Sequence, residues 1–249
     1  MNLENELSIA INAAIQVGEF ILKEKNKVVL SNLGKDIKLE ADKISEKKIL
    51  QYLSKSKYNV LSEETPEKII KNKNSDLCWI IDPLDGSFNF YKGIPHTAVS
   101  ISLWKGMEPL LGVIYDIHHK DLYSGIVGQE INLNGQKISV SNIEEKSRAV
   151  LMTGFPTKLD YSGENLKEFI VRIQDFKKIR HIGSAALSLA YVASGKAEAY
   201  YEKDIMLWDV AAGLALVKAA GGDVDFKKTK GYQLEVFASN GKIKNLKCR

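Results

Sequence analysis

Apolar residues recur at every third or fourth position near the start of the chain, which is the spacing of one face of a helix. This pattern predicts an amphipathic helix over residues 3–24. A second helix is expected over residues 42–53, where Ile44, Ile49 and Leu53 point inward. Shorter apolar runs then predict strands at residues 59–61, 79–81, 98–103, 111–115 and 121–124.

Turn residues and charge mark the end of this first set of elements. The pair Asn134-Gly135 predicts a hairpin over residues 131–140, because both residues tolerate positive φ. The lysine- and glutamate-rich stretch at residues 141–148 follows and predicts a boundary. We therefore divide the chain into an N-terminal α+β half, residues 1–141, and a C-terminal α/β half, residues 142–249.

The C-terminal half also mixes strand and helix patterns. Strands are predicted at residues 149–153 and 197–201, and helices at residues 164–174, 183–194 and 209–220. Gly221-Gly222 closes the last helix. Because strands and helices mix along the whole chain without a regular βαβ repeat, the expected fold class is α/β or α+β with stacked layers.

Composition excludes several classes of protein. With 249 residues, of which 45% are hydrophobic and 27% charged, the chain is long enough to bury a core and too apolar to be disordered. The net charge of +4 rests on a lysine excess, which does not favour nucleic acid as a partner. Two cysteines indicate a reducing cytoplasm. No run approaches the ~18 apolar residues that a membrane span needs.

Carboxylates stand at the end of three separate apolar runs. Glu63 and Glu64 follow one predicted strand, Asp82 and Asp85 follow another, and Asp209 opens a helix. Each has an ordinary explanation when taken alone, such as a solvated loop or a helix N-cap. Together they would repel one another in a cleft unless a cation lies among them. Mg²⁺ typically joins a few carboxylates to a substrate phosphate, so the pattern predicts a magnesium site.

The densest chemistry lies in the hexapeptide Asp82-Pro83-Leu84-Asp85-Gly86-Ser87. Proline locks the backbone after the first acid, and Gly86 lets the chain approach a ligand closely. Ser87 then stands where backbone N–H groups can point at an anion. A phosphatase of the haloacid dehalogenase type needs two aspartates separated by one residue. Two residues separate them here, so that alternative fails on spacing.

These motifs closely resemble those of the inositol monophosphatase family of metal-dependent, lithium-sensitive sugar phosphatases. Residues 79–90 resemble its first signature, residues 208–213 its second, and residues 61–64 its upstream acidic motif. Residues 183–186 and Glu202 match its substrate-contact segment. The resemblance spans residues 34 to 222 in the family's order. It implies a layered αβαβα fold, with an antiparallel sheet in the N-terminal half and a mixed sheet in the C-terminal half, and assembly as a homodimer.

The resemblance also implies a set of metal ligands for two or three Mg²⁺ ions. Glu63, Asp82 and the carbonyl of Leu84 would hold the first ion, and Asp82, Asp85 and Asp209 the second. A third, weaker ion would lie near Glu63. Mn²⁺ is the expected substitute, and Li⁺ and Ca²⁺ are the expected inhibitors.

Catalytic and substrate-binding roles follow from the same resemblance. Glu63 and the Ser87 hydroxyl would orient the attacking water, with Asp42 accepting a hydrogen bond from Ser87. Phosphate would lie on the metals and on the N–H groups of Gly86 and Ser87. The whole predicted substrate-binding set is Asp85, Gly86, Ser87, Ser184, Ala185, Glu202 and Asp209. Two departures from the family are Ser87, where it usually has threonine, and Met206, where some members carry histidine.

The predicted function is that of a hydrolase: a Mg²⁺-dependent phosphomonoesterase acting on a small polyol or sugar phosphate, with inositol 1-phosphate as the type substrate. Fructose-1,6-bisphosphatase and 3′(2′),5′-bisphosphate nucleotidase are alternatives within the family. Phe88 and Phe90 favour the inositol or fructose-bisphosphate branch over the nucleotidase branch. A non-catalytic binding protein on this fold is the alternative from a different class. The intact acids argue against it, because buried like charges without a metal are costly.

Overall fold

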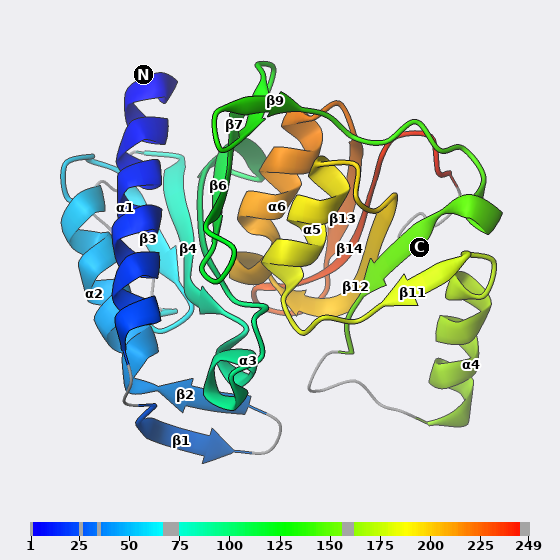
Figure 1. The fold of residues 1–249 in the computed structure, drawn as a ribbon, viewed down its shortest axis with the longest axis horizontal. Helices are drawn as coiled ribbons and strands as arrows, with labels where there is room; N and C mark the ends of the chain where they lie inside the picture. Colours follow the sequence, from blue (N-terminus) through cyan, green and yellow to red (C-terminus); the bar gives the residue numbers. More distant parts are fainter. Residues whose placement is uncertain (1, 25–26, 34–35, 67–74, 156–161, 245–249) are drawn as a thin grey trace.

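The chain folds into alternating layers of helices and sheets. The computed structural model describes residues 2–24, 27–33, 36–66, 75–155 and 162–244. Figure 1 shows the layers side by side: α1 (Leu3–Lys23) and α2 (Glu40–Leu53), a large sheet, α5 (Ala185–Ala193) and α6 (Leu207–Ala219), a smaller sheet, and α4 (Gly163–Ile173). This order confirms the expected αβαβα architecture.

The large sheet holds seven strands within the described residues, in the order β3-β4-β5-β6-β7-β8-β9. Their bounds are β3 (Asn59–Ser62), β4 (Leu77–Asp85), β5 (Ala98–Lys105), β6 (Glu108–Asp116), β7 (Asp121–Ile126), β8 (Ile131–Leu133) and β9 (Gln136–Ile138). All neighbours pair antiparallel except β3 and β4, which run parallel with Ser62 opposite Ile81. That parallel pair places the residues after both strands at the same edge of the sheet.

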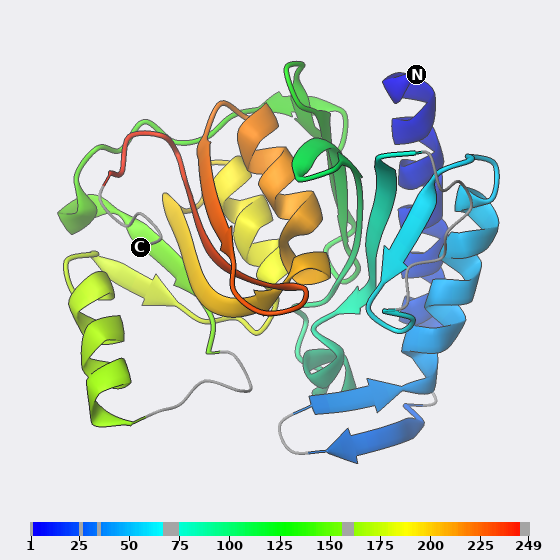
Figure 2. The ribbon, with the colours of Figure 1, turned by 180° about the vertical axis from the view of Figure 1, so that it is seen from behind.

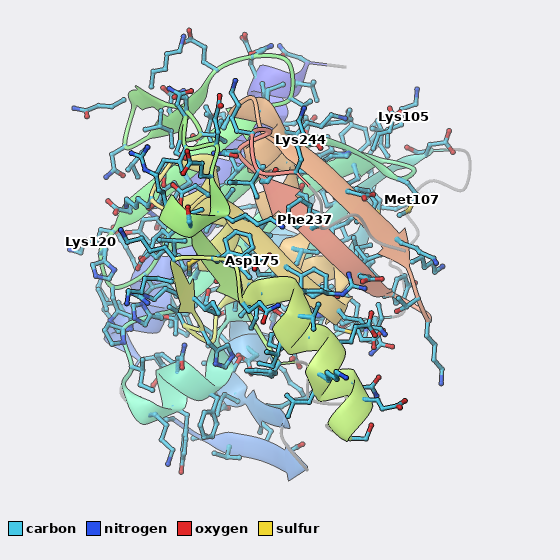
Figure 3. The ribbon with its side chains drawn as sticks, turned by 90° about the vertical axis from the view of Figure 1, so that its right-hand side faces the viewer. Lys105, Met107, Lys120, Asp175, Phe237 and Lys244 are labelled. Atoms are coloured by element: carbon cyan, nitrogen blue, oxygen red, sulfur yellow. The ribbon has the colours of Figure 1, made fainter. Side chains whose placement is uncertain are left out.

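The smaller sheet is mixed and has the order β11-β10-β12-β14-β13 in the described part of the chain. Its strands are β10 (Val150–Thr153), β11 (Lys178–Arg180), β12 (Ala199–Met206), β13 (Asp223–Lys228) and β14 (Gln233–Ser239). Strand β10 runs parallel to β11 and β12, whereas β14 runs antiparallel to β12 and β13. Figure 3 shows the outer face of this sheet, with α4 in front and Phe237 labelled.

Three apolar clusters hold the layers together. One lies between α1, α2 and the large sheet, a second surrounds α5 and α6, and a third lies under α4. Helix α6 is buried almost all round, as expected for a helix between two sheets. Two glycines let α6 lie close to its neighbours. A Cβ on Gly112 of β6 would overlap the carbonyl of Ala212 in α6, and a Cβ on Gly213 of α6 would overlap Leu189 of α5.

The predicted elements are found, with changes at their ends. Strand β4 extends into the acidic hexapeptide as far as Asp85, although Pro83 lies in this part of the strand. The strand tolerates the proline because its pairing with β5 shifts between Asp82 and Asp85. Strand β12 begins at Ala199 and continues to Met206, past the predicted end at residue 201. The hairpin turn is confirmed, with φ of 52° at Asn134 and 81° at Gly135.

Two elements near the hexapeptide were not predicted. Strands β1 (Val29–Leu33) and β2 (Asp36–Leu39) form a separate antiparallel hairpin, and α3 (Ser87–Lys92) begins at the last residue of the hexapeptide. Figure 2 shows this hairpin beside α3 at one edge of the molecule. A short 3₁₀ turn, η1 (Lys146–Arg148), lies in the stretch between the sheets, and the division into halves at residue 141 stays a prediction. None of the described helices is long and apolar enough to cross a membrane.

Candidate active site

Three carboxylates from three elements converge between the two sheets. Glu63 follows β3, Asp82 lies in β4, and Asp209 is the third residue of α6. Each offers one carboxylate oxygen, and these atoms lie within 4.8 Å of one another. The parallel pairing of β3 with β4 brings the first two together, since Glu63 comes directly after the residue paired with Ile81. The N-terminal turn of α6 supplies the third.

Electrostatics at this cluster favour a cation. Burial raises the pKa of Asp82 well above its usual range, and the charges of Glu63, Asp85 and Asp209 raise it further. Burial and the charge of Glu63 likewise raise the pKa of Asp209, although a backbone hydrogen bond from Met206 opposes the rise. The acids repel one another, and a divalent cation would relieve that repulsion. Clustered carboxylate oxygens are the donors that Mg²⁺ prefers, so these residues fit the metal that the motifs imply.

Asp85 lies beside this cluster and is held by the start of α5. Its Oδ2 accepts hydrogen bonds from the Ser184 hydroxyl and from the backbone N–H of Ala186, the latter at 3.1 Å. Burial raises the pKa of Asp85 to about 6, and the hydrogen bonds from α5, including one from the Ala185 backbone, oppose the rise. Ser184 also caps α5 by accepting from Leu187 N at 3.1 Å. The structure therefore places Ser184, a predicted substrate contact, directly behind Asp85.

Ser87 and Asp42 form the second pair that the motifs predicted. The Ser87 Oγ lies 3.1 Å from Asp42 Oδ1 and 2.9 Å from the Leu84 carbonyl oxygen. Asp42 stands at the start of α2, where its Oδ2 accepts a hydrogen bond from Leu39 N at 2.7 Å. Burial raises the pKa of Asp42 to about 7. A serine hydroxyl therefore lies between a buried carboxylate and a backbone carbonyl that was predicted to bind metal.

The backbone of the hexapeptide requires glycine at position 86. Gly86 has φ of +85°, and a Cβ there would lie 2.7 Å from the carbonyl oxygen of His96. The Asn89 side chain ties this turn to the segment before α5, donating to the carbonyls of His96 and Ile182 at 2.9 Å each. Asn89 lies inside the first signature, but its structural role was not predicted from the motif.

Glu202 lies on the smaller sheet, close enough to Asp85 and Asp209 for their charges to interact. It lies on β12 with 6% of its surface exposed, and burial raises its pKa to about 7. The Tyr200 hydroxyl donates a hydrogen bond to Glu202 Oε2 at 2.7 Å. The charge of Glu202 raises the pKa of Asp209, which indicates that both face the same space. The contact of Tyr200 with Glu202 was not predicted, because the predicted strand ended at residue 201 and left Glu202 outside it.

An ion pair joins the unpredicted hairpin to the acidic edge. Lys38 Nζ of β2 lies 3.4 Å from Glu64 Oε1, and the Glu64 side chain is only 4% exposed. The two residues after β3 therefore have different partners. Glu63 belongs to the carboxylate cluster, and Glu64 pairs with Lys38 of the hairpin. No signal in the sequence distinguishes these two roles, because the hairpin itself was not expected.

Comparison with protein families and sequences gives a consistent result. Residues 2–245 match the model of the inositol monophosphatase family. The relative from Xylella fastidiosa named Nus factor SuhB is 38% identical over 229 residues, which cover 89% of this chain and 82% of that protein. A protein of the same name from Escherichia coli K12 is 34% identical, covering 95% of this chain and 92% of its own length.

Solved structures agree with the sequence comparison. The inositol monophosphatase from Anabaena superimposes with a TM-score of 0.84 at 32% identity, covering 97% of this chain and 93% of that one. A structure named inositol monophosphatase–fructose 1,6-bisphosphatase has a TM-score of 0.77 at 28% identity, with coverage of 97% and 96%. The similarity therefore extends over nearly the whole length of this chain.

Proposed function

Since the chain belongs to the inositol monophosphatase family, we propose that it is a Mg²⁺-dependent phosphomonoesterase that hydrolyses the phosphate ester of a small polyol or sugar. Inositol 1-phosphate is the first substrate to test. The observation that carries the proposal is the cluster of Glu63, Asp82 and Asp209, whose carboxylate oxygens lie within 4.8 Å of one another. Such a cluster is costly unless a cation is bound there.

The proposed metal ligands are Glu63, Asp82, the carbonyl of Leu84, Asp85 and Asp209. When bound, Mg²⁺ supplies positive charge to the phosphate oxygens and lowers the pKa of a water molecule. Leu84 N donates to Asp82 Oδ1 at 3.0 Å, which orients that carboxylate within the turn. Asp85 is oriented by α5 through Ser184 and Ala186. The protein thus fixes its proposed ligands before any ion arrives.

Ser87 and Asp42 are the proposed route for the proton of the attacking water. The Ser87 hydroxyl would accept the hydrogen bond from water and pass a proton to Asp42, its neighbour at 3.1 Å. A base works best when its pKa is near the working pH, and Asp42 has a pKa of about 7. The N–H groups at the start of α3 would bind the phosphate, because the first N–H groups of a helix have no partner within it. Glu202, Ala185 and Asp209 would face the substrate's hydroxyls.

The proposal also concerns which of the family's substrates this protein hydrolyses. A phosphate-release screen with inositol 1-phosphate, fructose 1,6-bisphosphate and 3′-phosphoadenosine 5′-phosphate tests it directly. We expect turnover with Mg²⁺, loss of turnover in excess EDTA, and a decline as Li⁺ rises. Full turnover in excess EDTA would contradict the metal mechanism. A cytoplasmic homodimer is part of the same proposal, and sedimentation would test the dimer.

A second candidate function comes from the names of the relatives. The proteins called Nus factor SuhB carry a name that describes no hydrolase, at 34–38% identity to this chain. A binding protein on this fold therefore remains the candidate of a different class. It predicts that no phosphate ester in the screen is hydrolysed with Mg²⁺, whereas the phosphatase proposal predicts turnover of at least one. The two candidates are thus separated by the same measurement.

A further inference from the structure

The carboxylate of Glu202 is held from one side by a buried tyrosine. Tyr200 is 0% exposed, and its ring belongs to the apolar cluster around α5 and α6. Its hydroxyl donates to Glu202 Oε2 at 2.7 Å. Burial and the neighbouring Glu202 raise the pKa of Tyr200 well above its usual range, so the phenol keeps the proton that it donates. A rigid, protonated donor therefore fixes one oxygen of the carboxylate.

Gly154 closes the other side of the same carboxylate. It follows β10, the strand that pairs with β12. A Cβ on Gly154 would overlap Glu202 Oε2 and would lie only 2.5 Å from Oε1. The carboxylate thus occupies the space that any other residue at position 154 would fill. Gly154 has no positive φ, so this packing, and not backbone conformation, explains why glycine stands there.

The regular pairing of β12 with β14 extends as far as Glu202, which lies opposite Val236. The pairing of β12 with β14 shifts between Glu202 and Ile205, and Asp204 in the shifted segment has φ of 60°. The Thr229 hydroxyl donates to Asp204 Oδ1 at 2.8 Å and holds this segment. Tyr200 and Gly154 therefore contact a carboxylate on the last regularly paired residue before the shift.

We propose that Tyr200 and Gly154 are positioning residues that set substrate preference by fixing Glu202, so that its carboxylate accepts a hydrogen bond from a hydroxyl of a polyol phosphate. Above its pKa of about 7 the Glu202 carboxylate accepts hydrogen bonds and donates none, so there it selects a neutral hydroxyl and repels a second phosphate. Because Tyr200 donates to Oε2, Oε1 is the oxygen that we assign to the substrate hydroxyl. This inference rests on the proposed phosphatase function.

The test compares two substrates that share the phosphate ester and differ in hydroxyls. Inositol 1-phosphate carries hydroxyls for Glu202 to bind, and phenyl phosphate carries none. With Tyr200→Phe we expect kcat/KM for inositol 1-phosphate to fall about tenfold, mainly through KM, as for a lost hydrogen bond to a charged group. Turnover of phenyl phosphate should stay within about twofold of wild type. A purely structural effect would lower kcat/KM for both substrates together.

Tyr201→Phe is the matched control, because it removes the same group one residue away. Tyr201 is also buried, at 3% exposure, and its hydroxyl donates to Glu235 Oε1 at 3.0 Å in the cluster under α4. It points to the opposite face of the sheet from Tyr200. We expect Tyr201→Phe to leave the ratio of the two substrates unchanged, even where it lowers the melting temperature.

Gly154→Ala reaches the same carboxylate by an independent route. The added methyl group meets the far end of a flexible side chain, so the fold should survive while Glu202 moves. We expect the loss of preference seen with Tyr200→Phe. In a Glu202→Gln background, neither substitution should lower the preference further, since both act through Glu202.

These measurements distinguish failure of the proposed function from failure of the inference about Tyr200 and Gly154. A wild type that hydrolyses neither substrate with Mg²⁺ overturns the proposed function together with the inference that rests on it. A wild type that hydrolyses both, with variants at positions 200 and 154 that keep the substrate ratio, overturns the inference alone. An equal fall in kcat/KM for both substrates in the Tyr200→Phe variant would also overturn the inference. If Tyr200→Phe fails to fold, Gly154→Ala alone decides the matter.

Discussion

Ser87 has one hydroxyl proton and two acceptors within reach, the Leu84 carbonyl oxygen at 2.9 Å and Asp42 Oδ1 at 3.1 Å. Replacing Ser87 by alanine leaves the backbone N–H groups and the clustered acids in place. We expect Ser87→Ala to lower kcat by about 10²–10⁴ with little change in KM, because proton transfer and the aim of the water are lost. Steady-state kinetics with Mg²⁺ measure both constants.

Ser87→Thr is the control for that variant. Threonine keeps the hydroxyl and is the residue that the family usually has, so activity should stay within several-fold of wild type. Trapping of a phosphoserine at position 87 during turnover, detected by mass spectrometry, would contradict the role of Ser87 as a group that handles the water's proton. An alanine variant with normal kcat would contradict it as well.

Asp82 and Glu202 are both buried acids of the site, and their proposed roles differ. Asp82 lies in the three-carboxylate cluster, whereas Glu202 is proposed to face the substrate's hydroxyls. Asp82→Asn should abolish turnover, since it removes charge from the metal site. Glu202→Gln should mainly raise KM or change substrate preference. Equal losses of kcat at saturating Mg²⁺ would show that the roles are assigned wrongly.

The site residues that were predicted stand in recognisable short motifs, whereas the ones that were missed are identified only by their contacts in the folded protein. Glu63, Asp82 and Asp209 stand in short motifs at the ends of apolar runs, so composition and spacing identified them. Gly154 reaches Glu202 through the pairing of β10 with β12, which no local pattern reveals, whereas Tyr200 stands two residues before Glu202 on β12 itself. Tyr200 was predicted simply as part of a strand, because a buried tyrosine is ordinary there.

Elements with strong periodicity were predicted well because burial on one face determines them. Helices α1 and α2 show that periodicity over many residues, and they extend over Leu3–Lys23 and Glu40–Leu53. The hairpin β1–β2 was missed because its two strands are short and pair only with each other. The extension of β4 was missed because Pro83 argues against a strand, and the shift in pairing with β5 allows it.

At the scale of elements, the approach of α6 to β6 depends on one glycine. Gly112 lies on β6, and a Cβ there would overlap the Ala212 carbonyl of α6. We expect Gly112→Ala to lower the free energy of unfolding by about 1–3 kcal/mol, as for overpacking of a core. Urea denaturation followed by circular dichroism measures the change.

Gly163→Ala is the matched control for Gly112→Ala. Gly163 begins α4 on the far side of the molecule, and a Cβ there would meet no atom of the described residues within 4 Å. Its substitution should leave the free energy of unfolding within about 0.5 kcal/mol of wild type, as is usual for surface changes. Similar losses for both variants would mean that the contact between α6 and β6 is not what Gly112 provides.

At the scale of the whole molecule, the site exists only where the layers meet. Glu63 and Asp82 come from the large sheet, whereas Asp209 comes from the middle helical layer, which packs against both sheets. The order of the layers follows from amphipathic patterns and could be predicted, with help from the family resemblance. The meeting of the three carboxylates at one point depends on strand pairing and helix packing across the chain.

Proton binding couples this site to the stability of the molecule. Burial raises the pKa of Asp42 and of Glu202 to about 7 and that of Asp85 to about 6, whereas unfolded carboxyls have values near 4. Between these values the folded protein holds protons that the unfolded chain has released. These three groups therefore lower the stability of the metal-free protein as pH rises from about 4 to about 7.

Mg²⁺ should oppose the part of this decline that comes from its proposed ligands, such as Asp85, because they bind it as carboxylates and release their protons. We expect the melting temperature of EDTA-treated protein to fall between pH 5 and pH 8. Added Mg²⁺ should raise it more at pH 8 than at pH 5, as measured by differential scanning fluorimetry. Asp82→Asn removes one buried acid from the cluster, so its EDTA-treated form should lose less stability over the same range and gain less from Mg²⁺. A Mg²⁺ shift of equal size at both pH values, or one unchanged by Asp82→Asn, would contradict the link between the clustered protons and the metal.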